Sequence, residues 1–238
     1  MWNKDECHVE WWSAVQGLTE LEPVRPALKA MPECFKNIPR TRPQIEHIKG
    51  SSIKHCPGFV DLYKHSYVVP MWCDVTLEVI PGKGIKYTPS IDYFNASWHS
   101  PEQFSKHIPE NAKDSNVLAV KLESPWRVRT SPGWGMLQLP MLYEFNPNFE
   151  CLSGIIYTEK FHELNNQIMV KHTNKFLIER GTPIAMYIPI KLSSNKFTVE
   201  DETKDQKYAA QLSNLIINSK FGGAYKQFLN WWGNDKEY

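Results

Sequence analysis

The chain has 238 residues, and its 27 basic and 26 acidic side chains nearly cancel. This length suits one large domain or a core domain with appendages, and the balanced charge removes the overall field that would attract nucleic acid or an anionic membrane surface. The sequence contains no apolar run of roughly 18 residues and no signal-peptide pattern at its N-terminus. We therefore predict a soluble protein that is not secreted.

Residues 1–53 are predicted to form an extended arm, because five prolines between positions 23 and 43 remove donors and fix φ too often for long regular elements. A short amphipathic helix is predicted at residues 10–16, ended by Gly17. The neighbouring Trp11 and Trp12 are interpreted as anchors that dock the arm on its own core or on another subunit. The alternative is that one of the tryptophan pairs lines a pocket or a partner surface.

Residues 54–196 are predicted to form the core domain, which is mainly β and antiparallel, of sandwich or barrel type. Apolar and polar residues alternate from Cys73 to Val79, the period of a half-buried strand. Pro125 is expected to separate two strands, and Pro189 implies an edge position or a strand end. The further predicted strands cover residues 85–88, 91–94, 117–122, 126–129, 135–139, 155–157, 167–171, 176–179 and 184–190.

Two places predict helices outside or between these strands. Ser100-Pro101-Glu102-Gln103 has the residue types of a capping box with proline at the first helical position. Residues 197–238 are predicted to form a C-terminal segment of two helices with a hinge at Gly222-Gly223, because apolar residues recur there at helical spacing.

Several motifs between Lys54 and Leu192 resemble those of an uncharacterised protein family of tailed phages and some bacteria. They are Cys56-Pro57, Trp126 with Arg127-Val128-Arg129-Thr130, Ser131-Pro132-Gly133-Trp134, Leu152 to Glu159, and Ile178 to Ile184. This resemblance implies a shared β-fold, a phage origin and a location in the host cytoplasm or the virion. It implies no activity, because the family has no assigned chemistry.

A weaker resemblance is to the trimeric dUTPase and dCTP deaminase β-fold. Gly154-Ile155-Ile156 and the turn from Gly181 to Met186 are similar to that family in order and spacing. Tyr157 stands where the family has its catalytic aspartate, and Thr182-Pro183 replaces its Asp-Arg pair. The resemblance therefore implies nucleotide hydrolysis only if another carboxylate, such as Glu159, activates water.

Metal and thiol chemistry have little support in the residue pattern. The only His-x-Glu triplet is His8-Val9-Glu10 in the arm, so the sequence lacks the ligand pattern of a cupin-type iron site, and no metal site is predicted. The cysteines are odd in number and lack CxxC spacing, which indicates reduced, mostly buried thiols. They are Cys7, Cys34, Cys56, Cys73 and Cys151. His55 is badly placed to activate Cys56, because neighbours on an extended chain point to opposite faces.

The best site hypothesis is a polar set around two tryptophans. If the strands pair in sequence order, Arg127 and Arg129 face the loop from Glu159 to Asn165 and form a fork-shaped anion site beside a stacking ring. The preferred interpretation remains that both arginines are solvated charges on a strand face. The ligand-binding set is Trp126, Arg127, Arg129, Trp134, Glu159, His162, Asn165 and His172.

We therefore expect a phage-encoded binding or assembly protein without catalysis, which contacts a host target, other protein subunits or copies of itself in a homo-oligomer. The reasons are the incomplete catalytic sets, the balanced charge and the aromatic arms that must dock somewhere. The alternative is a nucleotide-type enzyme that uses Glu159 with Arg127 and Arg129, and that would bind a small anionic ligand. No cofactor can be named from the sequence.

Overall fold

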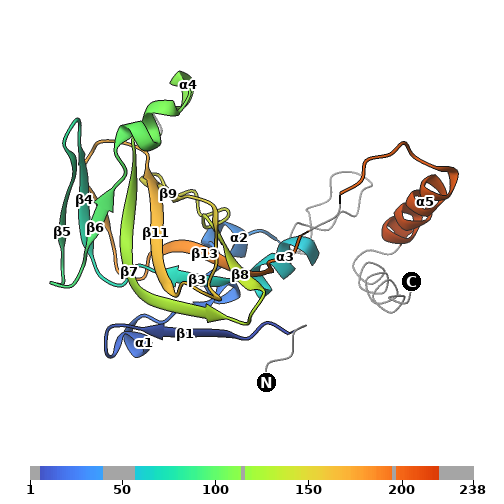
Figure 1. Ribbon diagram of the computed structural model, residues 1–238, viewed down its shortest axis with the longest axis horizontal. Helices are drawn as coiled ribbons and strands as arrows, with labels where there is room; N and C mark the ends of the chain where they lie inside the picture. The colour runs from blue at the N-terminus through green and yellow to red at the C-terminus, as the bar shows by residue number, and fades with distance from the viewer. Residues whose placement is uncertain (1–5, 40–56, 114–115, 195–196, 220–238) are drawn as a thin grey trace. The chain divides into compact units, whose positions relative to one another are not determined.

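The computed structural model describes residues 6–39, 57–113, 116–194 and 197–219 (Figure 1). Its contacts divide the chain into two units: Met1–Cys34 with Tyr63–Ser193, and Phe35–Leu62 with Ser194–Tyr238. The predicted second C-terminal helix and the Cys56 motif lie outside the described residues.

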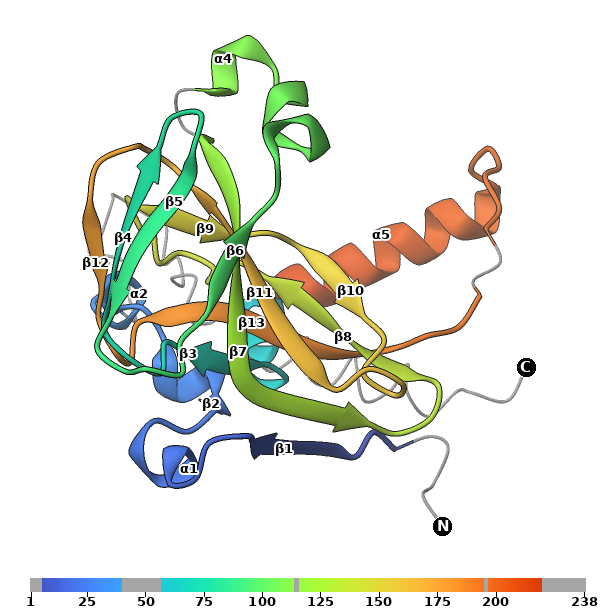
Figure 2. The same ribbon diagram turned by 60° about the vertical axis from the view of Figure 1, so that its left-hand side comes forward.

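The first unit is mainly β and antiparallel, as predicted, and is built from three sheets (Figure 2). In sheet A the strand order is β1-β7-β11-β9, and β6 also pairs with β7. The bounds are Val9–Ser13 for β1, Ala96–Trp98 for β6, Leu118–Thr130 for β7, Phe149–Cys151 for β9 and Glu163–Val170 for β11.

Sheet B has the strand order β10-β8-β13-β3-β2, and the third sheet has the order β12-β4-β5. The described strands thus form open sheets and no closed barrel. The bounds in sheet B are Arg25–Pro26 (β2), Tyr67–Pro70 (β3), Trp134–Leu139 (β8), Gly154–Ile156 (β10) and Pro183–Lys191 (β13). Those of the third sheet are Val75–Ile80 (β4), Gly84–Pro89 (β5) and Phe176–Ile178 (β12).

The core of this unit is formed by the inward-facing residues of the sheets, with Trp72 and Trp126 among its largest buried side chains. A buried polar contact ties sheets A and B together. The Tyr187 hydroxyl on β13 lies 2.7 Å from Gln138 Oε1 on β8, and it also contacts Asn166 Oδ1 on β11. A buried hydroxyl needs such partners, because an unpaired polar group in the core costs free energy.

The helix predicted at residues 10–16 was wrong, because this segment is strand β1. Trp11 points inward, with ring centroids 5.8 Å from Tyr67 and 5.9 Å from Tyr187, whereas Trp12 points outward to His162. Figure 1 shows β1 lying along the C-terminal part of β7, where Val9 pairs with Thr130 and Ser13 with Trp126. The pairing with β7 overrides the local helical pattern.

The strand break predicted at Pro125 was also wrong, because β7 runs through it without interruption. Proline lacks an N–H, so it needs a place where the ladder is irregular. On the β11 side the register shifts between Glu163 and Asn165, opposite this point of β7. On the β1 side, Pro125 only accepts a hydrogen bond, from the Ala14 N–H at 2.9 Å. The bulge thus accommodates the proline.

Of three further local predictions, two were confirmed and one was wrong. Strand β4 alternates buried and half-buried residues, and residues 84–89 return beside it as β5. The strand predicted at 91–94 was wrong, since the next strand is β6 at Ala96–Trp98. Pro189 lies beyond Tyr187, the last β13 residue that pairs with β3, so it occupies a locally open edge.

The helices are short, apart from α5. The capping box at Ser100 is present, but it begins the 3₁₀ turn Pro101–Gln103, which is followed by Ser105–His107. The other short elements are α1 (Leu18–Leu21), η1 (Ala27–Ala30), α2 (Glu33–Lys36), α3 (Pro57–Lys64) and α4 (Glu110–Lys113). No helix within the described residues is long and apolar enough to span a membrane.

In the second unit, Phe35 stacks on Phe59 with ring centroids 4.3 Å apart. Its helix α5 covers Lys204–Ser219, which confirms a C-terminal helix. Thr203 forms a capping box with Gln206, because each side chain binds the other residue's backbone N–H, at 3.2 and 2.7 Å.

Candidate binding groove

An open groove of about 800 Å³ lies where three of the predicted site residues meet, and we call it the aromatic groove. Strands β1, β7, β10 and β11 and the turn between β10 and β11 contribute to it. Its lining residues are Trp12, Arg127, Ile155, Ile156, Tyr157, Lys160, Phe161, His162, Glu163 and Asn165.

A row of three side chains crosses sheet A at this groove. In the register of the sheet Trp12 on β1 lies opposite Arg127 on β7, and Arg127 lies opposite Glu163 on β11. The Arg127 guanidinium donates from Nη2 to Glu163 Oε1 at 3.1 Å. Opposite charges on facing strands stabilise such a pair, so the charge of Arg127 is already balanced within the groove.

His162 is held in place by its backbone and its ring. Its carbonyl accepts a hydrogen bond from the Val128 N–H at 2.9 Å, and its Nδ1 lies 3.1 Å from the Thr158 carbonyl oxygen. The imidazole meets the Trp12 ring edge-to-face with centroids 5.6 Å apart. Trp12 and His162 therefore form one positioned aromatic wall.

The groove also exposes large apolar side chains. Ile155 is 52% exposed, Tyr157 53% and Phe161 69%. The backbone is nevertheless ordered by hydrogen bonds, because the N–H groups of Lys160 and Phe161 both donate to the Tyr157 carbonyl at 2.9 Å. Strand β10 and the ordered turn after it thus present apolar groups to solvent, which costs free energy until a partner covers them.

The remaining predicted site residues lie outside the aromatic groove. Arg129 forms an ion pair with Glu10 on β1, in which Nε donates to Oε2 at 3.1 Å. Glu159 accepts the Gly133 N–H at 2.7 Å, and its other oxygen lies 3.6 Å from Lys160 Nζ. The structure therefore does not bring Arg127, Arg129 and Glu159 to one point.

The two predicted stacking tryptophans are not groove residues either. Trp126 is buried in the core and Trp134 is half-buried. His172 lies beside a different part of the fold, where its Nε2 is 2.9 Å from Asn148 Oδ1 and its ring meets Phe176 at 5.3 Å.

The sequence did not predict Tyr157, Lys160 and Phe161 as groove residues, and it left Trp12 either as an anchor of the arm or as part of a pocket or partner surface. A signal was available at Phe161, an aromatic residue inside a polar turn. Trp12 had no local signal, because only the pairing of β1 with β7 brings it to Arg127.

The buried thiols of this unit are not prepared for nucleophilic chemistry. Burial raises the pKa of Cys151 to about 12 and that of Cys73 to about 12, with smaller contributions from Glu150 and Asp74. Both thiols are therefore protonated near neutral pH, and the thiolate is the reactive form. Among the described residues, no three His, Cys, Asp or Glu side chains are grouped closely enough to hold a metal ion.

Comparisons with known proteins give distant structural neighbours only. No family model matches the chain, and no curated protein is similar to it. A dUTPase variant of Staphylococcus bacteriophage 80alpha is 9% identical with a TM-score of 0.36, covering 83% of this chain and 98% of that one. A dUTPase variant from phage phi11 of S. aureus is 9% identical with a TM-score of 0.33, covering 76% and 97%. Another 80alpha dUTPase variant, solved with dUpNHpp, is 11% identical with a TM-score of 0.33, covering 76% and 88%. At such low scores and identities, neither a family nor an activity follows for this chain.

Proposed function

We propose that this protein is a non-catalytic binding protein, and that its aromatic groove docks an extended, apolar and acidic segment of another protein. The observation that carries the proposal is the exposure of Ile155 on β10 and of Tyr157 and Phe161 at the ordered turn that follows, all three of which line the groove. Apolar side chains fixed in solvent are stabilised when a partner removes them from water.

The composition of the groove supports a protein partner. Tyrosine, tryptophan, phenylalanine and arginine are the residue types enriched in the cores of protein interfaces, and the groove combines Trp12, Tyr157 and Phe161 with Arg127. Its open form suits an extended segment that lies along it. The rigid wall of Trp12 and His162 lowers the ordering cost on this side.

Charge decides which segment fits best. Arg127 and Lys160 outnumber Glu163 among the charged lining residues, and the Lys160 side chain is 71% exposed. Its nearest carboxylate, that of Glu159, is partly engaged by the Gly133 N–H. A carboxylate of the partner near Lys160 would therefore improve the charge balance of the groove.

The enzymatic alternative would need Arg127, Arg129 and Glu159 to act on one ligand. Instead, Arg129 is paired with Glu10, and Glu159 accepts the Gly133 N–H, so the two side chains are held in separate contacts. The described side chains would have to exchange these contacts before they could share an anionic substrate.

Site-directed photocrosslinking tests the proposal in the cells that produce the protein. A benzophenone amino acid replaces Phe161, and in the control it replaces Leu177, which is 51% exposed on β12. We expect one dominant crosslinked protein at position 161 and none at position 177. The captured partner is then purified, and its affinity is measured by calorimetry.

Matched variants complete the test. Phe161→Ser and Tyr157→Ser are each expected to weaken binding of the purified partner at least about tenfold, because removal of a central aromatic residue commonly costs more than about 1.4 kcal/mol. Leu177→Ser should leave the affinity unchanged. Equal crosslinking at both positions would contradict the proposal. A nucleoside triphosphate that raises the melting temperature of the wild type, but not of Arg127→Ala, would favour the enzymatic alternative.

A further inference from the structure

The loop between β8 and β9 contains two backbone conformations that side chains rarely adopt. Tyr143 has a φ of 62° and Phe145 a φ of 53°, and they are the only non-glycine residues with positive φ in the described part of the chain. Aromatic residues are not the types that visit this region easily. Strain of this kind persists where the surroundings enforce it, and it occurs preferentially at ligand clamps.

Side chains from distant segments enforce the conformation of this loop. The Tyr63 hydroxyl donates to the Leu142 carbonyl at 2.7 Å, and the Cys34 thiol donates to the Tyr143 carbonyl at 3.1 Å. At the other end, Lys171 Nζ donates to the Asn146 carbonyl at 3.0 Å. The loop is therefore held on both sides of Phe145.

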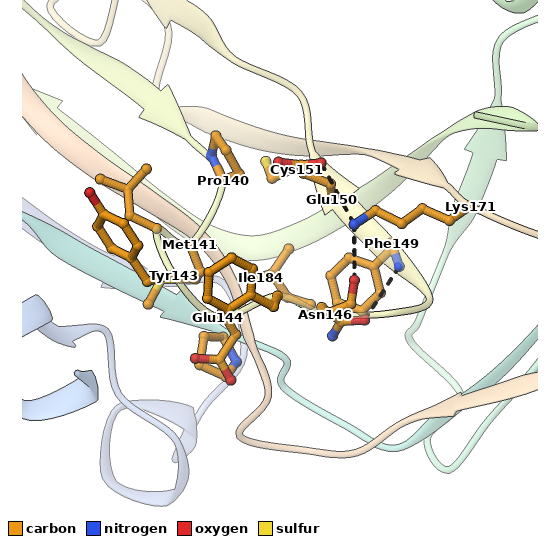
Figure 3. Close-up of a pocket in the computed structure, with 13 residues that line it drawn as sticks. Pro140, Met141, Tyr143, Glu144, Asn146, Phe149, Glu150, Cys151, Lys171 and Ile184 are labelled. Atoms are coloured by element: carbon orange, nitrogen blue, oxygen red, sulfur yellow. Dashed lines mark hydrogen bonds and ion pairs between the residues drawn. The ribbon is translucent and has the colours of Figure 1, made fainter. Parts of the chain in front are cut away.

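The loop lines a pocket of about 220 Å³, which we call the loop pocket (Figure 3). Phe149, Cys151 and Ile184 form a buried apolar wall. Tyr143 and Phe145 meet edge-to-face with centroids 6.4 Å apart, and Phe145 is 77% exposed. The pocket is smaller than the roughly 300–1,000 Å³ of drug-sized sites, so it suits a small ligand.

Carboxylates outnumber cations around the loop pocket. Figure 3 shows Glu144 and Glu150 toward different ends of it, with Lys171 beside Glu150. Lys171 is already engaged, because its Nζ lies 3.7 Å from Glu150 Oε2 and donates to the Asn146 carbonyl. Cys151 adds no charge near neutral pH. One negative charge is left over among the lining residues.

We propose that the loop pocket is a binding site for a small organic cation of the alkylammonium class. Aromatic faces attract such cations through the negative potential of the ring, and Tyr143 and Phe145 stand at the pocket with their rings nearly perpendicular. The surplus carboxylate charge complements the ligand, and the buried wall takes its alkyl groups. The loop pocket shares no lining residue with the aromatic groove, so this proposal can be tested independently of the proposed function.

The first experiment compares choline with its neutral isostere, in which carbon replaces the quaternary nitrogen, by protein-detected NMR titration of the full chain. We expect choline to bind about tenfold more tightly, because a partly desolvated cation–π contact is worth about that factor. Equal affinity for the isostere, tighter binding of propionate, or no binding of choline would each overturn the proposal.

Variants locate the binding on the loop. Phe145→Leu keeps an apolar side chain but removes the ring, and Glu150→Gln removes one charge, so each should weaken choline binding severalfold. Phe161→Leu in the aromatic groove is the matched control and should change nothing. Unchanged affinity in both Phe145→Leu and Glu150→Gln would contradict the assignment.

Tyr143→Gly separates a functional strain from a purely structural one. Glycine adopts positive φ without a steric cost, so this variant should unfold at a higher denaturant concentration than the wild type while it binds choline less tightly. A more stable protein with unchanged choline affinity would show that the Tyr143 ring has no part in the site, and would overturn the cation–π assignment.

The source of the cation is tested with the same protein. An alkylammonium group can belong to a free small molecule or to a lipid headgroup, and phosphatidylcholine vesicles distinguish the two. Wild-type protein that sediments with the vesicles, when Phe145→Leu does not, supports a headgroup ligand. Protein that binds choline but stays in solution supports a free ligand.

Discussion

Arg127 and Glu163 lie opposite each other on β7 and β11, and the guanidinium donates to the carboxylate at 3.1 Å. This pair stands in the same row as Trp12 and lies within the aromatic groove. Because the ion pair is substantially exposed, we expect it to contribute little to the free energy of unfolding, although it lies in the proposed binding groove.

Arg127→Ala should lower the free energy of unfolding by less than about 1 kcal/mol, because solvent screens exposed ion pairs. Urea denaturation of Arg127→Ala, Glu163→Ala and the double variant measures the pair directly. The ion pair of Glu10 with Arg129 serves as a control outside the groove. A coupling above about 2 kcal/mol would show that the pair is structural.

Trp11→Ala should destabilise the protein by about 3 kcal/mol, as loss of a large packed aromatic side chain does, because its ring packs on Tyr67 and Tyr187. Trp12→Ala should cost less than about 1 kcal/mol, because Trp12 faces the groove on the outer side of β1. Chemical denaturation of both variants gives the comparison. Equal losses would mean that Trp11 and Trp12 do not lie on opposite faces of β1.

Gly84→Ala should cost about 3 kcal/mol. Gly84 has a φ of 97°, and an added Cβ would lie 2.2 Å from the Trp98 ring, so backbone strain and overpacking add. Gly82→Ala is the control, because its φ of 71° is similar but the space around it is open. Thermal unfolding should show a smaller loss at position 82, and Trp98→Ala should recover part of the loss at position 84.

Stability should fall as pH rises from about 9 to 12, in part because of Cys151. Its thiol has an unfolded pKa of 9.0 that burial raises to about 12 in the native state. Between these values the unfolded chain releases a proton that the native protein retains, so the free energy of unfolding decreases with pH. The thiol contributes a slope that approaches about 1.4 kcal/mol per pH unit.

Urea denaturation at pH 8, 9, 10 and 11 checks this contribution. Cys151→Ala should show a shallower fall above pH 9 than the wild type, because it removes the buried thiol. Parallel curves for the wild type and Cys151→Ala would refute the assigned cause.

The sequence predicted secondary structure correctly where interactions between neighbouring residues determine it. The alternation from Cys73 to Val79 predicted β4, because side chains on a strand point alternately to its two faces. The Ser100 capping box could also be predicted, because its hydrogen bonds join residues that are three apart in the sequence. The sequence did not show which strands pair with each other, because strand pairing depends on contacts between distant segments.

The site shows the same division. Arg127, His162 and Asn165 line one groove, but the pairing of β7 with β11 brings them together, and not the pairing in sequence order that the prediction assumed. The sequence by itself determined which residues alternate, turn and cap, and therefore that this protein is mainly β. Only the tertiary structure decided that the segment predicted as a helix at residues 10–16 contains strand β1, which pairs with β7. It also decided that Trp12 reaches Arg127 and that Arg129 is held by Glu10. The physical reason is that periodicity is a property of neighbouring residues, whereas strand pairing and the packing of the sheets are settled by the free energy of the whole fold.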